Sequence, residues 1–111
     1  MNRPSIAYSE SQHFAPDDLN RLYRSVAWSA ATKLDALRRG LEGSHRVVSG
    51  WDGARLIGLG NAISDGALVV YFPHLLVDPS YQGQGIGKEL MRRLQEPYQG
   101  FHQQVLVADG D

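Results

Sequence analysis

The stretch Leu75-Leu-Val-Asp-Pro-Ser-Tyr-Gln-Gly-Gln-Gly-Ile-Gly-Lys-Glu-Leu-Met91 carries most of the information about fold and function in this chain. It begins with an apolar run, turns at an Asp-Pro pair, and then places three glycines within positions 83–87. Apolar side chains recur at helical spacing from position 86 onward. Glycines let a backbone take positive φ and approach a ligand, and N–H groups at a helix start favour phosphate. The stretch therefore predicts a buried strand, a phosphate-binding loop and a helix.

Two familiar phosphate loops do not fit this stretch. A Walker A loop requires Ser or Thr after its Gly-Lys pair, but Glu89 follows that pair here. A dinucleotide fingerprint requires a further glycine where Lys88 or Leu90 stands. The pattern that does fit is Gln82-x-x-Gly85-x-Gly87.

The rest of the chain predicts a mixed α/β domain of order β-α-α-β-β-β-α-β. Apolar positions at helical spacing predict helices over 16–26, 34–41 and 86–94, the last of them ended by Pro97. Alternating or continuous apolar runs predict strands over 3–9, 46–51, 55–63, 67–77 and 105–107, with a hairpin turn at Asp52-Gly53. No linker rich in Pro, Gly or Ser divides the chain, so residues 1–111 are expected to form one domain.

Pro73 conflicts with the predicted strand over 67–77. That strand is almost continuously apolar, as expected for a central strand covered on both faces. Proline cannot donate a hydrogen bond to a sheet, so it occurs at edges or bulges. We therefore expect a bulge or a local splay of the strands near Pro73.

Composition excludes several function classes. Eleven Lys and Arg against twelve Asp and Glu give a net charge of -1, which argues against a dedicated nucleic-acid binder. The chain has no cysteine, and its four histidines never stand three or four residues apart, so neither a thiolate site nor a local metal motif is predicted. The longest apolar run is too short to span a bilayer. These features predict a soluble, cytoplasmic protein that binds neither nucleic acid nor membranes.

The motif Gln82-x-x-Gly85-x-Gly87 resembles the acyl-coenzyme A pyrophosphate loop of the GNAT superfamily of N-acetyltransferases. The preceding strand and Asp-Pro turn, Tyr81 and the order of elements over nearly the whole chain are also similar to that family. The resemblance implies acetyl-CoA as the donor substrate, bound by a strand, loop and helix over about 67–97. It implies acceptor-side helices over about 16–41. The implied coenzyme-binding residues are Leu75, Leu76, Val77, Gln82, Gly83, Gln84, Gly85, Ile86, Gly87 and Lys88. A Gly-rich turn can also be only a tight connection to a helix.

Within this resemblance, the acceptor amine attacks the thioester directly, and a backbone N–H near Leu75 or Leu76 stabilises the oxyanion. An alkylamine is mostly protonated at neutral pH and needs a base, for which His74 is the candidate. His74 departs from the acidic residue that related sequences often carry here, and a histidine hydrogen-bonded in the core is the alternative. Tyr23, Trp28 and Tyr71 are candidates for an acceptor pocket of a small-molecule amine, with packing in the core as their alternative.

The family pattern continues beyond a fifth strand with a helix and two more strands, for which no sequence follows Asp111. A fragment of a longer chain, completion by another subunit, and a degenerate domain all remain open. An apolar strand at 105–107 without a neighbour would be an exposed edge, so we expect a homo-oligomer, in the simplest case a dimer. The alternative to an N-acetyltransferase is a non-catalytic acyl-CoA-binding or interaction module that oligomerises through this edge.

Overall fold

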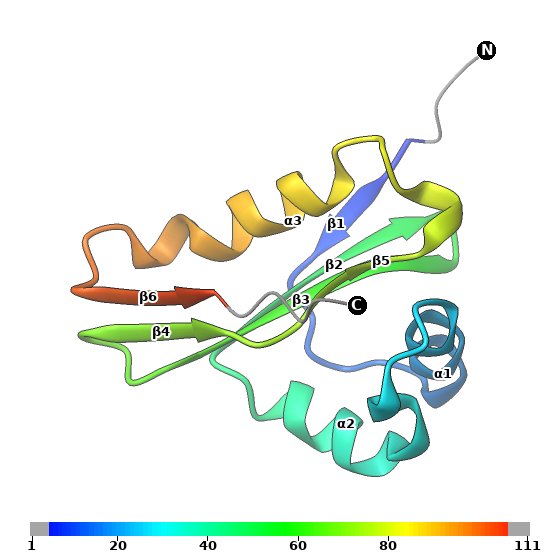
Figure 1. Ribbon diagram of the computed structural model, residues 1–111, viewed down its shortest axis with the longest axis horizontal. Helices are drawn as coiled ribbons and strands as arrows, with labels where there is room; N and C mark the ends of the chain where they lie inside the picture. The colour runs from blue at the N-terminus through cyan, green and yellow to red at the C-terminus, as the bar shows by residue number, and fades with distance from the viewer. Residues whose placement is uncertain (1–4, 107–111) are drawn as a thin grey trace.

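The computed structural model describes residues 5–106 and shows a mixed sheet between two layers of helices (Figure 1). The helices are α1 (Pro16–Ser25), α2 (Leu34–Glu42) and α3 (Ile86–Gln95). The strands are β1 (Ala7–Ser9), β2 (Arg46–Asp52), β3 (Arg55–Ser64), β4 (Val69–Phe72), β5 (Leu75–Val77) and β6 (Gln103–Leu106). The mixed α/β fold predicted from the sequence is confirmed, with α3 on one face of the sheet and α1 with α2 on the other.

Amphipathic faces explain where the helices lie. In α1, Pro16 occupies the first turn and acidic residues follow it, while Leu19, Leu22 and Tyr23 are fully buried. In α2, Leu37 and Leu41 face inward at a spacing of four residues. These side chains form one apolar cluster with buried residues of β2 and β3, and α3 forms a second cluster on the opposite face.

The single strand predicted over 67–77 is wrong as one element, because the structure divides it into β4 and β5. Pro73 has no N–H, and the N–H of His74 is accepted by Oδ1 of Asn61 at 2.9 Å instead of by a strand carbonyl. β4 pairs with β3 and, in parallel, with β6, whereas β5 pairs with β3. β5 therefore parts from β6, which is the splay expected near Pro73.

Other boundaries differ by a few residues. β1 begins at Ala7, whereas the prediction began at residue 3, and residues 3 and 4 lie outside the described part. The last strand begins at Gln103, earlier than the predicted residue 105, and Val107 also lies outside the described part. The hairpin turn is Gly53-Ala54, since Asp52 still pairs with Arg55. The end of α3 two residues before Pro97 confirms that prediction.

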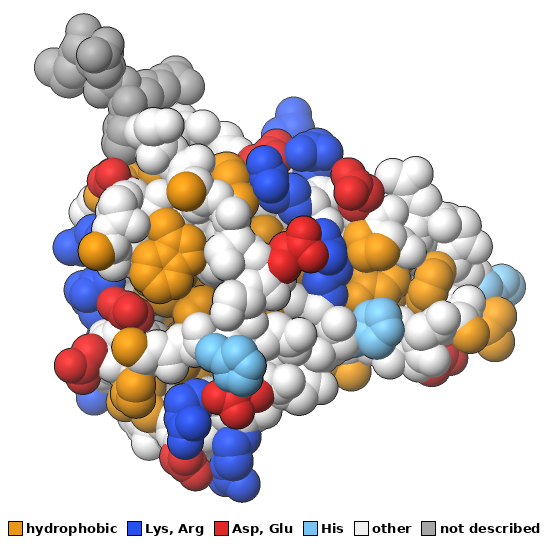
Figure 2. Space-filling model, turned by 180° about the vertical axis from the view of Figure 1, so that it is seen from behind, with side chains coloured by type: hydrophobic (Ala, Val, Ile, Leu, Met, Phe, Trp, Pro, Cys, Tyr) orange, Lys and Arg blue, Asp and Glu red, His pale blue; other side chains and the backbone are white. Residues whose placement is uncertain are grey.

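Charged side chains form local pairs on the surface. Over the face in Figure 2, basic side chains lie beside acidic ones and do not gather into one patch of either sign. On α2, for example, Asp35 pairs with both Arg38 and Arg39, at 3.1 Å in each case. This distribution agrees with the nearly balanced charge of the sequence.

Candidate functional site

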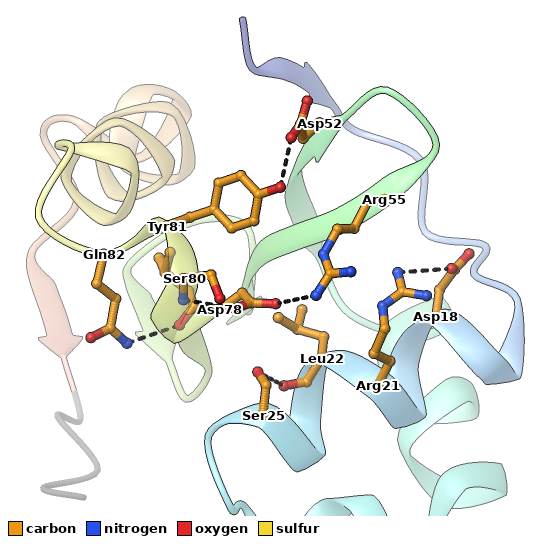
Figure 3. Close-up of polar contacts among 11 residues, drawn as sticks. Asp18, Arg21, Leu22, Ser25, Asp52, Arg55, Asp78, Ser80, Tyr81 and Gln82 are labelled. Carbon is orange, nitrogen blue, oxygen red and sulfur yellow. Dashed lines mark hydrogen bonds and ion pairs between the residues drawn. The ribbon is translucent and has the colours of Figure 1, made fainter. Parts of the chain in front are cut away.

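A buried carboxylate holds the turn that follows β5. Asp78 is only 3% exposed; its Oδ1 accepts the N–H of Ser80 at 2.8 Å and its Oδ2 accepts from Arg55 at 3.1 Å (Figure 3). Burial opposes the charge, but the bonds from Ser80 and Arg55 outweigh it and hold the pKa of Asp78 below its ordinary value. The turn chemistry expected at Asp78-Pro79 is confirmed, and it fixes the direction in which the loop leaves the sheet.

Two side-chain hydrogen bonds fix the beginning of the loop. The hydroxyl of Tyr81 donates to Oδ2 of Asp52 in the β2–β3 hairpin at 2.6 Å. Nε2 of Gln82 donates to the carbonyl of Val77 at 2.9 Å, so this side chain folds back onto β5 (Figure 3). The loop is thus anchored to both the hairpin and the strand before the glycines begin.

Two glycines of the loop adopt a left-handed backbone conformation, which glycine can take because it has no side chain. Gly83 and Gly85 both have φ of +80°, which other residues adopt only with strain. A Cβ placed on either glycine would meet no atom within 4 Å, so open space lies in front of this backbone. α3 begins directly after Gly85, with no side-chain cap, so its first N–H groups remain available to a ligand.

A cavity of about 400 Å³ lies in front of this loop. We call it the loop cavity. Of the ten residues predicted to bind the coenzyme, all except Gln84 line it. The lining residues are Val26, Trp28, Leu75, Leu76, Val77, Tyr81, Gln82, Gly83, Gly85, Ile86, Gly87 and Lys88.

One edge of β5 opens into the loop cavity. β5 runs antiparallel to β3, with Leu76 opposite Leu59, and backbone hydrogen bonds join the pairs on either side at His74–Asn61 and Asp78–Ile57. Because hydrogen-bonded pairs alternate along antiparallel strands, Leu76 directs its backbone polar groups toward β3. The N–H and carbonyl of Leu75 therefore point to the open edge, whereas those of Leu76 do not.

His74 lies at the beginning of β5 and is hydrogen-bonded to a buried phenol. Its Nδ1 is 2.7 Å from Oη of Tyr23, whose side chain is fully buried. Burial raises the pKa of Tyr23 far above its ordinary value, so the phenol keeps its proton. A proton can be taken up at Nε2 of His74 when Nδ1 carries hydrogen and donates to Tyr23. Tyr23 thus orients the imidazole.

Trp28 reaches the site because α1 ends in a tight turn. The N–H of Trp28 bonds to the carbonyl of Tyr23, and the N–H of Ala27 bonds to that of Arg24. This is a Schellman ending, in which Ala27 takes the left-handed φ of +58° that glycine usually supplies. The Trp28 ring lies edge-on to His74, with centroids 5.1 Å apart. Trp28 therefore lines the loop cavity and packs against the imidazole.

A second cavity, of about 330 Å³, lies on the other side of His74. We call it the α2 cavity, and its lining residues are Ala30, Lys33, Ala36, Leu37, Gly40, Leu41, Asn61, Ile63, Pro73 and His74. Tyr71 lies elsewhere, since it faces a shallow surface formed by β4 and β6 and is 38% exposed. The structure thus brings together Tyr23, Trp28 and His74 but does not bring Tyr71 to them.

The comparisons with known proteins agree with this geometry. A family model described as "Acetyltransferase (GNAT) domain" matches residues 8–108. The chain belongs to the GNAT acetyltransferase family. A GNAT family acetyltransferase from Streptococcus pneumoniae is 28% identical, with a TM-score of 0.82 over 96% of this chain and 78% of that one. An aminoglycoside N-acetyltransferase solved with CoA is similar in fold alone, at 15% identity, with a TM-score of 0.73 over 98% of this chain and 80% of that one.

The match to a plant relative covers a smaller share of that relative's length. A histone acetyltransferase of soybean (Glycine max) is 38% identical over an alignment of 88 residues that covers 69% of this chain. The match spans only 38% of the length of that relative. The two proteins therefore share the GNAT domain. The substrate of the whole relative is a property of that protein alone.

The two arginines of α3 form ion pairs with a glutamate of the same helix. Arg92 and Arg93 both donate to Glu89, and these bonds lower the pKa of Glu89 to about 2. Arg93 also lies over the Tyr8 ring, 4.4 Å from its centroid. Lys88 lines the loop cavity and is exposed, so it is the basic side chain that α3 offers there.

Residues 5–106 contain neither a candidate metal-binding cluster nor a helix that could cross a membrane. No three His, Cys, Asp or Glu side chains in this part lie close enough together to hold a metal ion. None of its helices has the length and apolar character needed to cross a bilayer.

Sequence reasoning missed Asn61, Lys33 and Gly40. Asn61 is a buried amide that accepts from the N–H of His74 and donates to Oγ of Ser44 at 3.1 Å. Asn61 is the one amide in a predicted strand that carries no other polar side chain after Arg55, and this was the available signal for a strand break opposite it. Lys33 and Gly40 had no such signal, because only the packing of α2 beside Pro73 makes them part of a cavity.

Proposed function

We propose that this chain is an N-acetyltransferase that moves an acetyl group from acetyl-CoA to the primary amine of a small molecule. The observation that carries the proposal is the alignment of three features along β5. The glycine loop and the start of α3 lie at one end, the open backbone edge lies in the middle, and His74 lies at the other end. The relative of similar fold that was solved with CoA supports the identity of the donor.

The loop cavity has the chemistry that a coenzyme of this kind requires. Pyrophosphate oxygens would accept hydrogen bonds from the N–H groups between Gln82 and Lys88, where the helix dipole also favours negative charge. The amide-containing arm would lie along β5 as an added strand and bond to the outward backbone groups of Leu75. The thioester would then lie beside the N–H of Leu75 and within reach of His74.

Acetyl transfer at this position needs two functions from the protein. The N–H of Leu75 would stabilise the oxyanion that forms when the amine nitrogen attacks the thioester carbon. His74 would accept the proton of the amine at Nε2, while Tyr23 holds its Nδ1–H. The oxyanion then collapses to the amide, the carbon–sulfur bond breaks, and CoA leaves as a thiolate that takes a proton from solvent.

The test of the proposal is calorimetric titration with acetyl-CoA, followed by an assay of thiol release with a panel of amines. The wild-type chain should bind acetyl-CoA, and Gly85→Glu should weaken binding by more than about 100-fold, because it strains the turn and places a carboxylate against the phosphates. Gly100→Glu is the matched control, since Gly100 also has positive φ (+90°) and open space but lies outside the loop cavity.

The two functions can fail separately. Absence of a calorimetric signal at saturating acetyl-CoA would refute coenzyme binding. Binding without thiol release for any amine would refute the transferase and favour a non-catalytic acyl-CoA-binding module. β6 is an edge strand among the described residues, and association into a dimer stays a prediction that sedimentation of the same sample can test.

A further inference from the structure

The α2 cavity has an unusual chemical character for a site that accepts an amine. Most of its lining is apolar, from Ala30, Leu37, Leu41 and Ile63. None of the described residues that line it is acidic. An ammonium group carried on the body of a substrate would therefore find no carboxylate there to compensate the loss of its water.

The only charged side chain among the described lining residues is a lysine. Lys33 occupies the position directly before α2 and is exposed to solvent at the cavity mouth. Among residues 5–106 no carboxylate lies within ion-pair distance of Lys33, whereas Asp35 and Glu42 on the same helix pair with Arg38. The cavity mouth therefore repels a second positive charge and favours a neutral or negative one.

Space for the body of a substrate comes from a glycine inside α2. Gly40 lines the cavity, and a Cβ placed on it would meet no atom within 4 Å. Glycine within a helix costs about 1 kcal/mol relative to alanine, and the backbone of Gly40 does not take positive φ. What Gly40 supplies at this position is room beside Pro73 and His74.

We infer that the α2 cavity accepts an apolar monoamine, such as an arylalkylamine, whose remote end is neutral or anionic, and that Lys33 excludes polycationic amines. The inference rests on the proposed function, because it places the reacting amine at His74 and the apolar body between α2 and β3. His74 lines the cavity beside Leu75, where the thioester would lie. The specificity that follows differs from that of an enzyme that acts on polyamines, aminoglycosides or lysine-rich peptides.

The experiment compares three amines built on one scaffold: 2-phenylethylamine, its para-carboxylate and its para-aminomethyl analogue. Release of thiol from acetyl-CoA gives kcat/KM for each amine. We expect the carboxylate to equal or exceed the neutral amine and the dication to be slower by about fivefold or more, the effect of one partly solvated charge contact. Spermidine extends the series to a polycation without an aromatic body.

Two variants localise the effect. Lys33→Glu should reverse the order of the two charged analogues when each is compared with the neutral amine. Arg39→Glu is the matched control, because it makes the same charge change on α2 at a residue outside the cavity lining. Gly40→Leu should raise KM for all three amines about tenfold by filling the cavity, while the Kd for acetyl-CoA stays unchanged.

The outcomes separate this inference from the proposed function. Faster transfer to the dication or to spermidine, or an unchanged order in Lys33→Glu, would overturn the inference while acetyl transfer stands. If acetyl-CoA binds but no amine is acetylated, the proposed function fails. Calorimetry with the same three amines then decides the inference: weaker binding of the dication supports it, and equal or tighter binding overturns it.

Discussion

The two cavities on either side of His74 are built from different parts of the polypeptide. Around the loop cavity, backbone dominates, with two glycines at positive φ, the first N–H groups of α3 and the open edge of β5. Around the α2 cavity, side chains dominate, from α2, the strand opposite it and Pro73. A backbone site recognises groups common to every donor molecule, such as phosphate and amide, whereas a side-chain site recognises the particular body of an acceptor.

This difference separates two kinds of change during evolution or engineering. Substitutions in α2 can alter the walls of the α2 cavity without altering any backbone conformation. Any substitution of Gly83 or Gly85 strains the backbone, because both residues have φ of +80°. We therefore expect acceptor specificity to change more readily than donor specificity. Three predictions, in order of decreasing effect, test this separation.

The largest effect is expected at the junction of the two cavities. His74→Ala should lower kcat for acetyl transfer about 100-fold, the lower range for loss of a positioned general base, while the Kd for acetyl-CoA stays unchanged. The limb of the profile that rises with pH should disappear from kcat/KM, because the proton acceptor is gone. Tyr23→Phe should lower kcat less, since the ring and the imidazole remain and only the orienting bond is lost.

Measurements of thiol release between pH 5 and pH 9 check this prediction. His13→Ala is the control, because His13 is exposed on the surface and lines neither cavity. A pH profile that does not differ between His74→Ala and the wild-type chain would remove His74 as the base. A large loss of acetyl-CoA affinity in the same variant would show that the two cavities do not act separately.

The same difference explains which parts of the molecule the sequence could predict. The loop cavity was largely predictable because all its lining residues except Val26 and Trp28 lie in one stretch, Leu75 to Lys88, whose conformation follows from its glycines and from a helix start. The α2 cavity joins Lys33 and Gly40 to Asn61 and Pro73, which meet only after the sheet has formed. Tyr71 was predicted to line an acceptor pocket with Tyr23 and Trp28, but it lies within β4 opposite Ile63 and faces the surface beside β6.

The intermediate effect is expected at the buried carboxylate beside the loop cavity. Asp78→Asn should lower the free energy of unfolding by about 1.5 kcal/mol at neutral pH, since it removes the charge that Arg55 and the N–H of Ser80 stabilise. It should also weaken acetyl-CoA binding, because Asp78 sets the direction of the loop. KM for the acceptor amine should not change.

The pH dependence of stability gives this prediction a second readout. Because the pKa of Asp78 is lowered in the folded state, its contribution is fully present above the unfolded pKa of about 4 and is lost as the pH falls below it. Urea unfolding between pH 2.5 and pH 7 should therefore show a smaller loss in Asp78→Asn than in the wild-type chain. Asp65→Asn, which also removes a carboxylate that accepts backbone N–H groups, is the control that leaves acetyl-CoA affinity intact.

The smallest effect compares one glycine from each cavity under the same substitution to alanine. Gly40→Ala should raise the free energy of unfolding by about 0.5–1 kcal/mol, because Gly40 is helical and an added methyl group meets open space. Gly85→Ala should lower the free energy of unfolding by about 1 kcal/mol, because the left-handed φ of +80° strains alanine. Urea unfolding measures both changes, and opposite signs would show that backbone conformation requires the glycine of the loop cavity, whereas space alone requires that of the α2 cavity. Changes of the same sign would contradict this distinction, because the same physical requirement would then explain both glycines.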